Sequence, residues 1–296
     1  MSAAGMVRRN KRYIVWFFLL NLLFAHFGAN AFSTHVHAIL DHSLYSDRML
    51  HGFDPTVFLE MLFRPDFGPL RSSSALATIF AVLFLVASIV FMPGVLLGYS
   101  YDHRISRNEF FRACSQNLWR FVRLFLIYAV IAGLITAILF GVQAGAAHAA
   151  ERSLDERVPI LVQFAGLVII FLIMTSVRIW FDLAQTRVVL QDQAAVRKTL
   201  RPALRMTRQH IGHLLGSYVV ISIAALVVFV AGIWLWHSIV PASSVLGAFL
   251  ISEAMMLVLL GMRFWQRAVA VAFYLDQQME AAEVAISSRT TAIANV

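Results

Sequence analysis

The chain has 296 residues, of which 60% are hydrophobic and 14% are charged, and its formal net charge is +8. Soluble globular domains carry about 25% charged residues, so this composition excludes an ordinary water-soluble fold and favours a protein embedded in lipid. The single cysteine, Cys114, excludes an intrachain disulfide and a zinc site built from several cysteines. No soluble segment carries the basic and aromatic stripe that nucleic acid requires, so we expect no nucleic-acid partner.

Six apolar stretches are each long enough to cross the hydrocarbon core as a helix, which takes about 20 residues. They predict an all-α fold, a polytopic membrane helical bundle with about six transmembrane helices plus amphipathic interfacial helices. We expect a single transmembrane domain at residues 1–275 and a polar, partly disordered cytoplasmic tail at 276–296. The predicted spans are residues 13–32, 75–98, 124–144, 158–178, 214–240 and 245–262.

The basic residues predict the orientation of these spans. If both termini are cytoplasmic, the outer side holds five of the 24 Lys and Arg residues and the cytoplasmic side holds the other 19. Short loops rich in Lys and Arg stay on the cytoplasmic side of a membrane. The sequence therefore predicts a multi-pass protein with cytoplasmic N- and C-termini.

The longest outer loop, residues 33–74, is expected to hold two short amphipathic helices. His35, His37 and His42 lie in it and are candidate metal ligands, because imidazole binds zinc, copper and nickel. Their spacing matches no familiar ligand set, so neither a metal nor a cofactor is predicted. His42 and Asp47 also have the H-x4-D spacing of glycerolipid acyltransferases, in which a histidine acts as a base. No other acyltransferase motif accompanies this pair.

Two cytoplasmic segments, residues 109–121 and 199–211, look like copies of one basic amphipathic helix that leads into an apolar one. At an offset of 90 residues, Ala113 aligns with Ala203 and Phe121 aligns with Ile211. Basic helices beside spans attract anionic lipid headgroups, although the positive-inside rule alone also explains such charges. The residues predicted to face headgroups are Arg112, Arg120, Arg201, Arg205 and Arg208.

Glu253 is the one acidic residue within a predicted span, and ionisable groups at that depth often have a function. Asn21 and His26 lie at comparable depth on the first span. Two roles are open for Glu253: a hydrogen bond to Asn21 or His26 that holds helices together, or a place on a proton or substrate pathway.

A further charged pair, Arg178 and Asp182, is four residues apart on the helix that leaves the fourth span. This spacing allows an ion pair at the cytoplasmic interface, which we interpret as a structural anchor. The glycines, such as Gly133 and Gly141, are expected at close helix contacts, and the Pro93-Gly94 pair is expected to kink the second span.

The order of elements resembles an uncharacterised family of bacterial six-span inner-membrane proteins and, loosely, the membrane domain fused to glycerophosphodiester phosphodiesterases. The resemblance rests on the basic helices that begin at Phe110 and Leu200 and on the run at residues 178–184, and it covers the second to sixth spans. It implies a bacterial cytoplasmic membrane and no particular activity, because no phosphodiesterase domain is present.

No nucleotide-binding loop, zinc-protease motif or serine-hydrolase motif is present. The favoured hypothesis is therefore a non-enzymatic membrane protein: a scaffold, an assembly factor or a lipid-organising component. Its expected partners are the bilayer with its anionic headgroups and either another protein or a second copy of the chain. The alternative is a small transporter or permease that uses Glu253. A lipid-modifying enzyme of the outer face ranks third.

Overall fold

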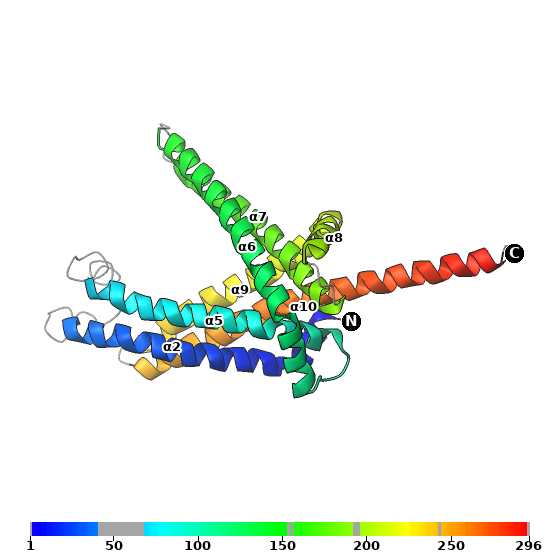
Figure 1. The fold of residues 1–296 in the computed structure, drawn as a ribbon. Helices are drawn as coiled ribbons and strands as arrows, with labels where there is room; N and C mark the ends of the chain where they lie inside the picture. Colours follow the sequence, from blue (N-terminus) through cyan, green and yellow to red (C-terminus); the bar gives the residue numbers. More distant parts are fainter. Residues whose placement is uncertain are drawn as a thin grey trace. The chain divides into compact units, whose positions relative to one another are not determined.

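The computed structural model describes residues 2–40, 68–152, 155, 157–191, 196–241 and 244–294. Every regular element in these ranges is a helix, and Figure 1 shows their arrangement. The helices are α1 (Ala3–Arg9), α2 (Lys11–Leu40), α5 (Gly68–Ser100), α6 (Arg107–Ala150), α7 (Arg157–Leu190), α8 (Val196–Gln209), α9 (Ile211–Ile239) and α10 (Val245–Ala294).

Five of the described helices, α5, α6, α7, α9 and α10, are long and apolar enough to cross a membrane, which indicates a multi-pass membrane protein. Large apolar side chains remain exposed along them, including Val130 at 70%, Phe164 at 69% and Val220 at 66%. Such exposure is unfavourable in water and is expected where a helix faces lipid. The first predicted span lies on α2 and is not among these five.

Several helices run past the predicted boundaries. α2 continues to Leu40 and α5 begins at Gly68, so both enter the loop predicted at 33–74. α10 continues to Ala294, and the predicted tail is helical wherever it is described. The change from apolar to polar residues indicates where a helix leaves the lipid, but the helix itself continues beyond that point. Five of the residues at 276–296 are alanine, which has the highest helix propensity.

The two predicted interfacial helices differ in how they join the following span. Residues 109–121 form the beginning of α6, which runs without interruption for 44 residues. Ser106 begins this helix with a capping box: its side chain accepts from the Glu109 backbone N–H, and the Glu109 carboxylate accepts from the Ser106 backbone N–H. α8 is instead a separate helix, with a turn at His210 before α9.

Contacts divide the chain into two compact units, where the sequence predicts a single transmembrane domain. Unit 1 contains residues 1–10, 89–222 and 264–296, and unit 2 contains residues 11–88 and 223–263. α5, α9 and α10 each contribute residues to both units.

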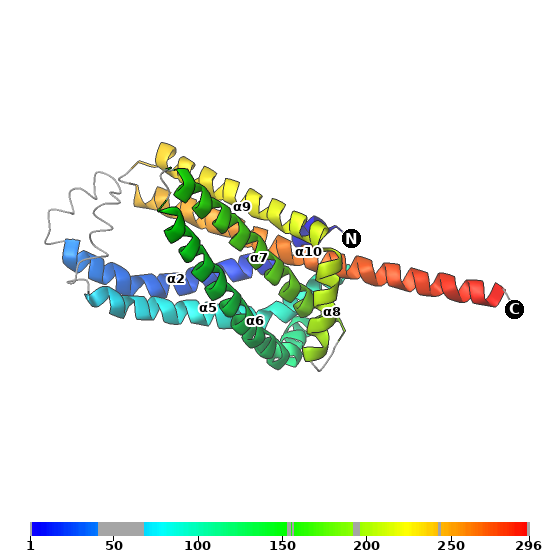
Figure 2. The same cartoon turned by 90° about the horizontal axis from the view of Figure 1, so that it is seen from above.

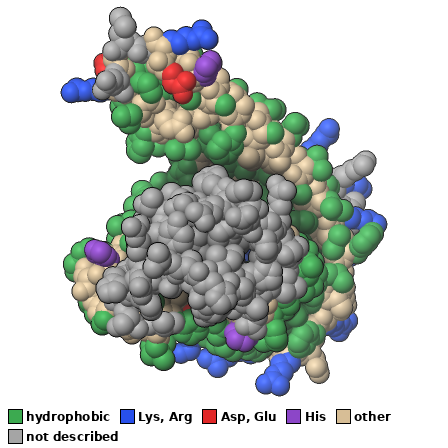
Figure 3. Space-filling model, turned by 90° about the vertical axis from the view of Figure 1, so that its left-hand side faces the viewer, with side chains coloured by type: hydrophobic (Ala, Val, Ile, Leu, Met, Phe, Trp, Pro, Cys, Tyr) green, Lys and Arg blue, Asp and Glu red, His purple; other side chains and the backbone are tan. Residues whose placement is uncertain are grey.

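In unit 1, α6 and α7 lie side by side as a hairpin, and α8 lies beside α7 (Figures 1 and 2). Charged and histidine side chains gather at the tip of the hairpin above a band of hydrophobic ones (Figure 3). One pair at this tip is His148 and Glu151, with 3.3 Å between Nδ1 and Oε2. This charge distribution is the one expected of a hairpin whose sides contact lipid and whose tip contacts water.

Pro93 lies inside α5, and its neighbour Gly94 allows α6 to approach closely. A Cβ atom built on Gly94 would lie 2.5 Å from the Phe110 ring and 2.8 Å from the sulfur of Cys114. By contrast, a Cβ atom at Gly133 or Gly141 would meet nothing within 4 Å. The expectation of close contacts at those two glycines is therefore wrong within the described chain.

In unit 2, aromatic side chains join α2 to α5, and a glycine brings α9 to α10. The Phe27 and Phe80 rings stack with their centroids 5.8 Å apart, and Phe24 lies 6.0 Å from Phe80. Gly232 faces Met255, whose side chain occupies the space that a Cβ atom on the glycine would need. Residues of α2 and α10 also border one cavity, which is described below.

Candidate functional site

The buried face of α8 repeats the buried face at the beginning of α6. Ala113 and Ala203 are both buried, and so are Asn117 and Thr207 four residues later. The side chain of each of these polar residues donates to the carbonyl of its alanine, at 3.1 Å for Asn117 and 2.9 Å for Thr207. The offset of 90 residues therefore matches positions that have the same environment and the same hydrogen bond.

This correspondence extends into the preceding spans, α5 and α7. The offset of 90 residues aligns the end of α5 with the end of α7, and aligned positions are buried in both helices. The buried pairs include Met92 with Asp182, Leu96 with Thr186, and Tyr99 with Val189. The end of a long apolar helix, followed by a helical segment with matching buried positions, is thus present twice in unit 1.

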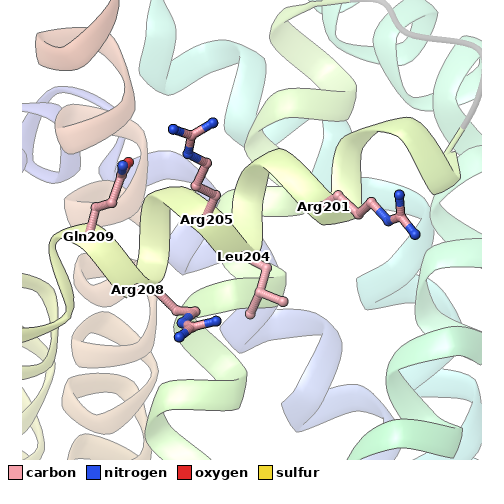
Figure 4. Close-up of a pocket in the computed structure, with 5 residues that line it drawn as sticks. All are labelled: Arg201, Leu204, Arg205, Arg208 and Gln209. Carbon is pink, nitrogen blue, oxygen red and sulfur yellow. The ribbon is translucent and has the colours of Figure 1, made fainter.

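The opposite face of α8 carries three exposed arginines. Successive residues of an α-helix turn by about 100°, so Arg201, Arg205 and Arg208 lie within roughly 60° of one another. Figure 4 shows all three on α8: Arg205 points to one side of the helix, Arg208 points to the other side, and Arg201 extends toward the beginning of the helix. They border an open cavity of about 440 Å³ together with Leu204 and Gln209.

A hydrogen bond from α7 fixes α8 in this position. The indole Nε1 of Trp180 donates to the carbonyl oxygen of Leu200 at 3.0 Å. Thr199, Ala203 and Thr207 then form the buried side of α8, opposite the arginines. No pattern in the sequence predicted this bond, because it joins residues of two different helices.

The predicted basic residues of α6 differ from those of α8 in their exposure and hydrogen bonding. Arg112 is exposed, as a headgroup-facing residue must be. Arg120 is half-buried, and its Nη1 donates to Oδ1 of Asn117 at 3.2 Å. Of these two helices, α8 is the one that brings three arginines to one cavity within the described residues.

Glu253 borders a second cavity, which lies within unit 2. Its side chain is half-buried, and Oε2 is buried without a hydrogen-bond partner. His26 borders the same cavity from α2, whereas Asn21 is half-buried and is not among the lining residues. Among the described residues, Glu253 forms no hydrogen bond to Asn21 or His26, so the predicted bridge is absent there.

The predicted pair of Arg178 and Asp182 is present, and it belongs to a larger polar cluster. Nε of Arg178 lies 3.7 Å from Oδ2 of Asp182, whose side chain is only 9% exposed. The hydroxyl of Tyr218 on α9 donates to the same Oδ2 at 2.9 Å. Arg267 on α10 lies close enough to Asp182 for their charges to interact.

Gln266 extends this cluster to the next turn of α9. Its Nε2 donates to the Tyr218 carbonyl oxygen at 3.3 Å and to Oγ of Ser222 at 3.0 Å. The cluster thereby joins α7, α9 and α10 within unit 1. Sequence reasoning missed Tyr218 and Gln266, because neither is charged and their partners are distant in the sequence.

A second polar contact lies between α6 and α7. The buried Gln143 donates from Nε2 to Oε1 of Gln163 at 3.3 Å and to the Val162 carbonyl oxygen at 3.2 Å. Gly166 leaves the space that the Gln143 side chain fills. An amide pair between apolar helices strengthens their association in a membrane.

The histidine candidates lie largely outside the described residues. His42 lies wholly outside, and His35 and His37 lie on α2 but their side chains are not described. Where side chains are described, no group of three His, Cys, Asp or Glu residues is placed to hold a metal ion.

No family model matches this sequence, and neither a curated protein nor a solved structure matches it. Inference about its function therefore depends on the geometry of the helices.

Proposed function

We propose that the protein is a non-enzymatic component of the bacterial cytoplasmic membrane that binds anionic phospholipid headgroups through α8 and so organises lipid or anchors an assembly. In this proposal α2 contributes a sixth span, and both termini are cytoplasmic. The observation that carries it is the set of three exposed arginines around one open cavity on a helix whose other face is buried.

The chemistry of this cavity favours phosphate. A guanidinium group binds phosphate oxygens through two parallel N–H bonds, and several arginines close together fit a doubly charged or clustered anion. Each basic residue near an anionic membrane surface contributes about 1 kcal/mol of attraction. The exposed Leu204 beside the arginines can contact the apolar part of a lipid, as interfacial helices do.

The test is the lipid preference of the whole protein in nanodiscs. Native mass spectrometry measures how much phosphatidylglycerol and phosphatidylcholine remain bound after release from mixed nanodiscs. We expect the wild type to retain phosphatidylglycerol preferentially and the triple variant R201Q/R205Q/R208Q to lose most of that preference. The control is Arg152→Gln, which removes an exposed positive charge outside α8. If the triple variant retains the preference of the wild type, α8 is not the headgroup site.

The second candidate function is a small transporter or permease, and the cavity at Glu253 favours it. A binding cavity beside an intramembrane carboxylate is a typical feature of transporter sites. Uptake by proteoliposomes tests this candidate: Glu253→Gln should abolish accumulation of a substrate that the wild type takes up. Unchanged uptake by that variant would remove Glu253 from any transport pathway.

A further inference from the structure

The cavity between α2 and α10 lies entirely within unit 2 and has a volume of about 520 Å³. Sites for small molecules typically have volumes of about 300–1,000 Å³ and apolar walls with a few polar groups. The lining fits this description, since an acidic and an imidazole side chain interrupt an otherwise apolar surface. The lining residues are Leu19, Leu22, Leu23, Ala25, His26, Phe249 and Glu253.

Glu253 lies deep enough to be surrounded by hydrocarbon. It is eight residues after Val245, where α10 begins, which corresponds to about 12 Å along the helix axis. The hydrocarbon core is about 30 Å thick, so this position is well below the membrane surface. A carboxylate at this depth requires a partner, because lipid cannot solvate its charge.

The protein itself supplies no such partner in the part of the chain that is described. Among the described residues, Oε2 of Glu253 is buried and accepts no hydrogen bond, and no ion pair involves Glu253. Glu253 nevertheless borders the cavity, and leucine side chains line the same space. A carboxylate side chain that borders an apolar cavity favours a ligand that is apolar and carries one cationic donor.

We propose that this cavity binds a lipophilic amine, whose protonated nitrogen pairs with Glu253 and whose hydrocarbon part contacts the leucines and Phe249. A charge-assisted hydrogen bond to a carboxylate is stronger than a neutral one, and the apolar surroundings strengthen it further. His26 is the second polar group of the lining and can accept another N–H of the same amine when its ring is neutral.

Other ligand classes fit less well. An anion would be repelled by the carboxylate, and a polar neutral molecule such as a sugar would leave its hydroxyl groups without partners against leucine side chains. A bare metal cation needs several oxygen ligands, but the described lining offers one carboxylate. Of these ligand classes, a lipophilic amine is the one that pairs with the Glu253 carboxylate and also contacts the apolar walls.

This inference is independent of headgroup binding by α8, and it requires no transport. The two cavities lie on different helices, and the amine site uses no arginine. Binding at Glu253 can therefore be measured whether or not the protein moves its ligand.

The experiment compares two probes that differ in charge alone. The whole protein is placed in nanodiscs of zwitterionic phosphatidylcholine. Binding of two dodecyl probes is followed by fluorescence: both carry a dansylamino group at one end of the chain, and the other end carries a free primary amine in one probe and a hydroxyl group in the other. Both probes also partition into lipid, so the measured quantity is the ratio of their affinities compared among protein variants in identical nanodiscs. We expect the wild type to bind the amine about tenfold more tightly than the alcohol, the ratio that one charge-assisted hydrogen bond supplies.

Three variants decide the outcome. Glu253→Gln should reduce the ratio to that of empty nanodiscs, whereas Glu280→Gln, which removes an exposed carboxylate from the same helix, should leave it unchanged. Leu23→Trp should reduce binding of both probes because the larger ring occupies the cavity. The proposal is overturned if the wild type does not distinguish the probes, if the ratio persists in Glu253→Gln, or if Leu23→Trp binds normally.

Discussion

The hydroxyl of Tyr218 donates a hydrogen bond of 2.9 Å to Oδ2 of Asp182, and both side chains are buried. This bond joins α9 to α7, and Arg178 contacts the same carboxylate oxygen. A buried carboxylate satisfied from two sides holds helices together, but it becomes unfavourable when one partner is removed.

Tyr218→Phe should therefore destabilise the protein by about 1–3 kcal/mol, the usual effect of removing one partner from a buried hydrogen bond. The measurement is thermal or denaturant unfolding of the purified protein in detergent. Tyr101→Phe is the control, because Tyr101 is 43% exposed. Equal stabilities of the two variants would show that the bond contributes nothing.

Gly94→Ala should destabilise the contact between α5 and α6, since the new methyl group would lie 2.5 Å from the Phe110 ring. Overpacking of this kind costs about 1–3 kcal/mol. Gly141→Ala is the matched substitution, because nothing lies within 4 Å of the added atom and alanine favours helix by about 1 kcal/mol. The unfolding midpoint should fall in Gly94→Ala and rise in Gly141→Ala. A fall of the same size in both variants would contradict the close approach at Gly94.

The Gln143 and Gln163 side chains should couple energetically across the α6–α7 hairpin. A double-mutant cycle with Gln143→Leu and Gln163→Leu measures this coupling, and hydrogen bonds between membrane helices average about 0.6 kcal/mol in such cycles. Thr136, whose hydroxyl contacts the sulfur of Met174, provides a second pair along the same interface. Strict additivity of the two glutamine substitutions would argue against a direct bond.

Trp180→Phe should loosen α8, because the variant keeps an aromatic side chain but has no indole N–H. The variant loses the indole donor to the Leu200 carbonyl oxygen, so amide hydrogens of α8 should exchange faster than in the wild type. Hydrogen–deuterium exchange of the whole protein measures this effect. Trp119→Phe is the control, because Trp119 is 63% exposed at the beginning of α6. Unchanged exchange in α8 would show that other contacts hold it.

The helical class of the fold followed directly from the sequence, since long apolar runs in lipid have few alternatives to helix. The pair of Arg178 and Asp182 was also predictable, because its four-residue spacing is local. Trp180, Tyr218 and Gln266 were not, since each bonds to a residue at least 20 positions away. The intramembrane position of Glu253 was a feature of the sequence, whereas its cavity depends on how α2 and α10 pack.

The shared register of residues 109–121 and 199–211 has a practical consequence. The two segments bury an alanine and a back-bonded polar residue at the same positions, so the packing at these two positions is equivalent. Their exposed faces differ, because Arg205 and Arg208 align with Ser115 and Leu118. Unit 1 thus contains two segments that share a buried alanine and a back-bonded polar residue but differ in the charge of their exposed faces. The positive surface of α8 can therefore be altered by substitution at its arginines without a change at these two buried positions.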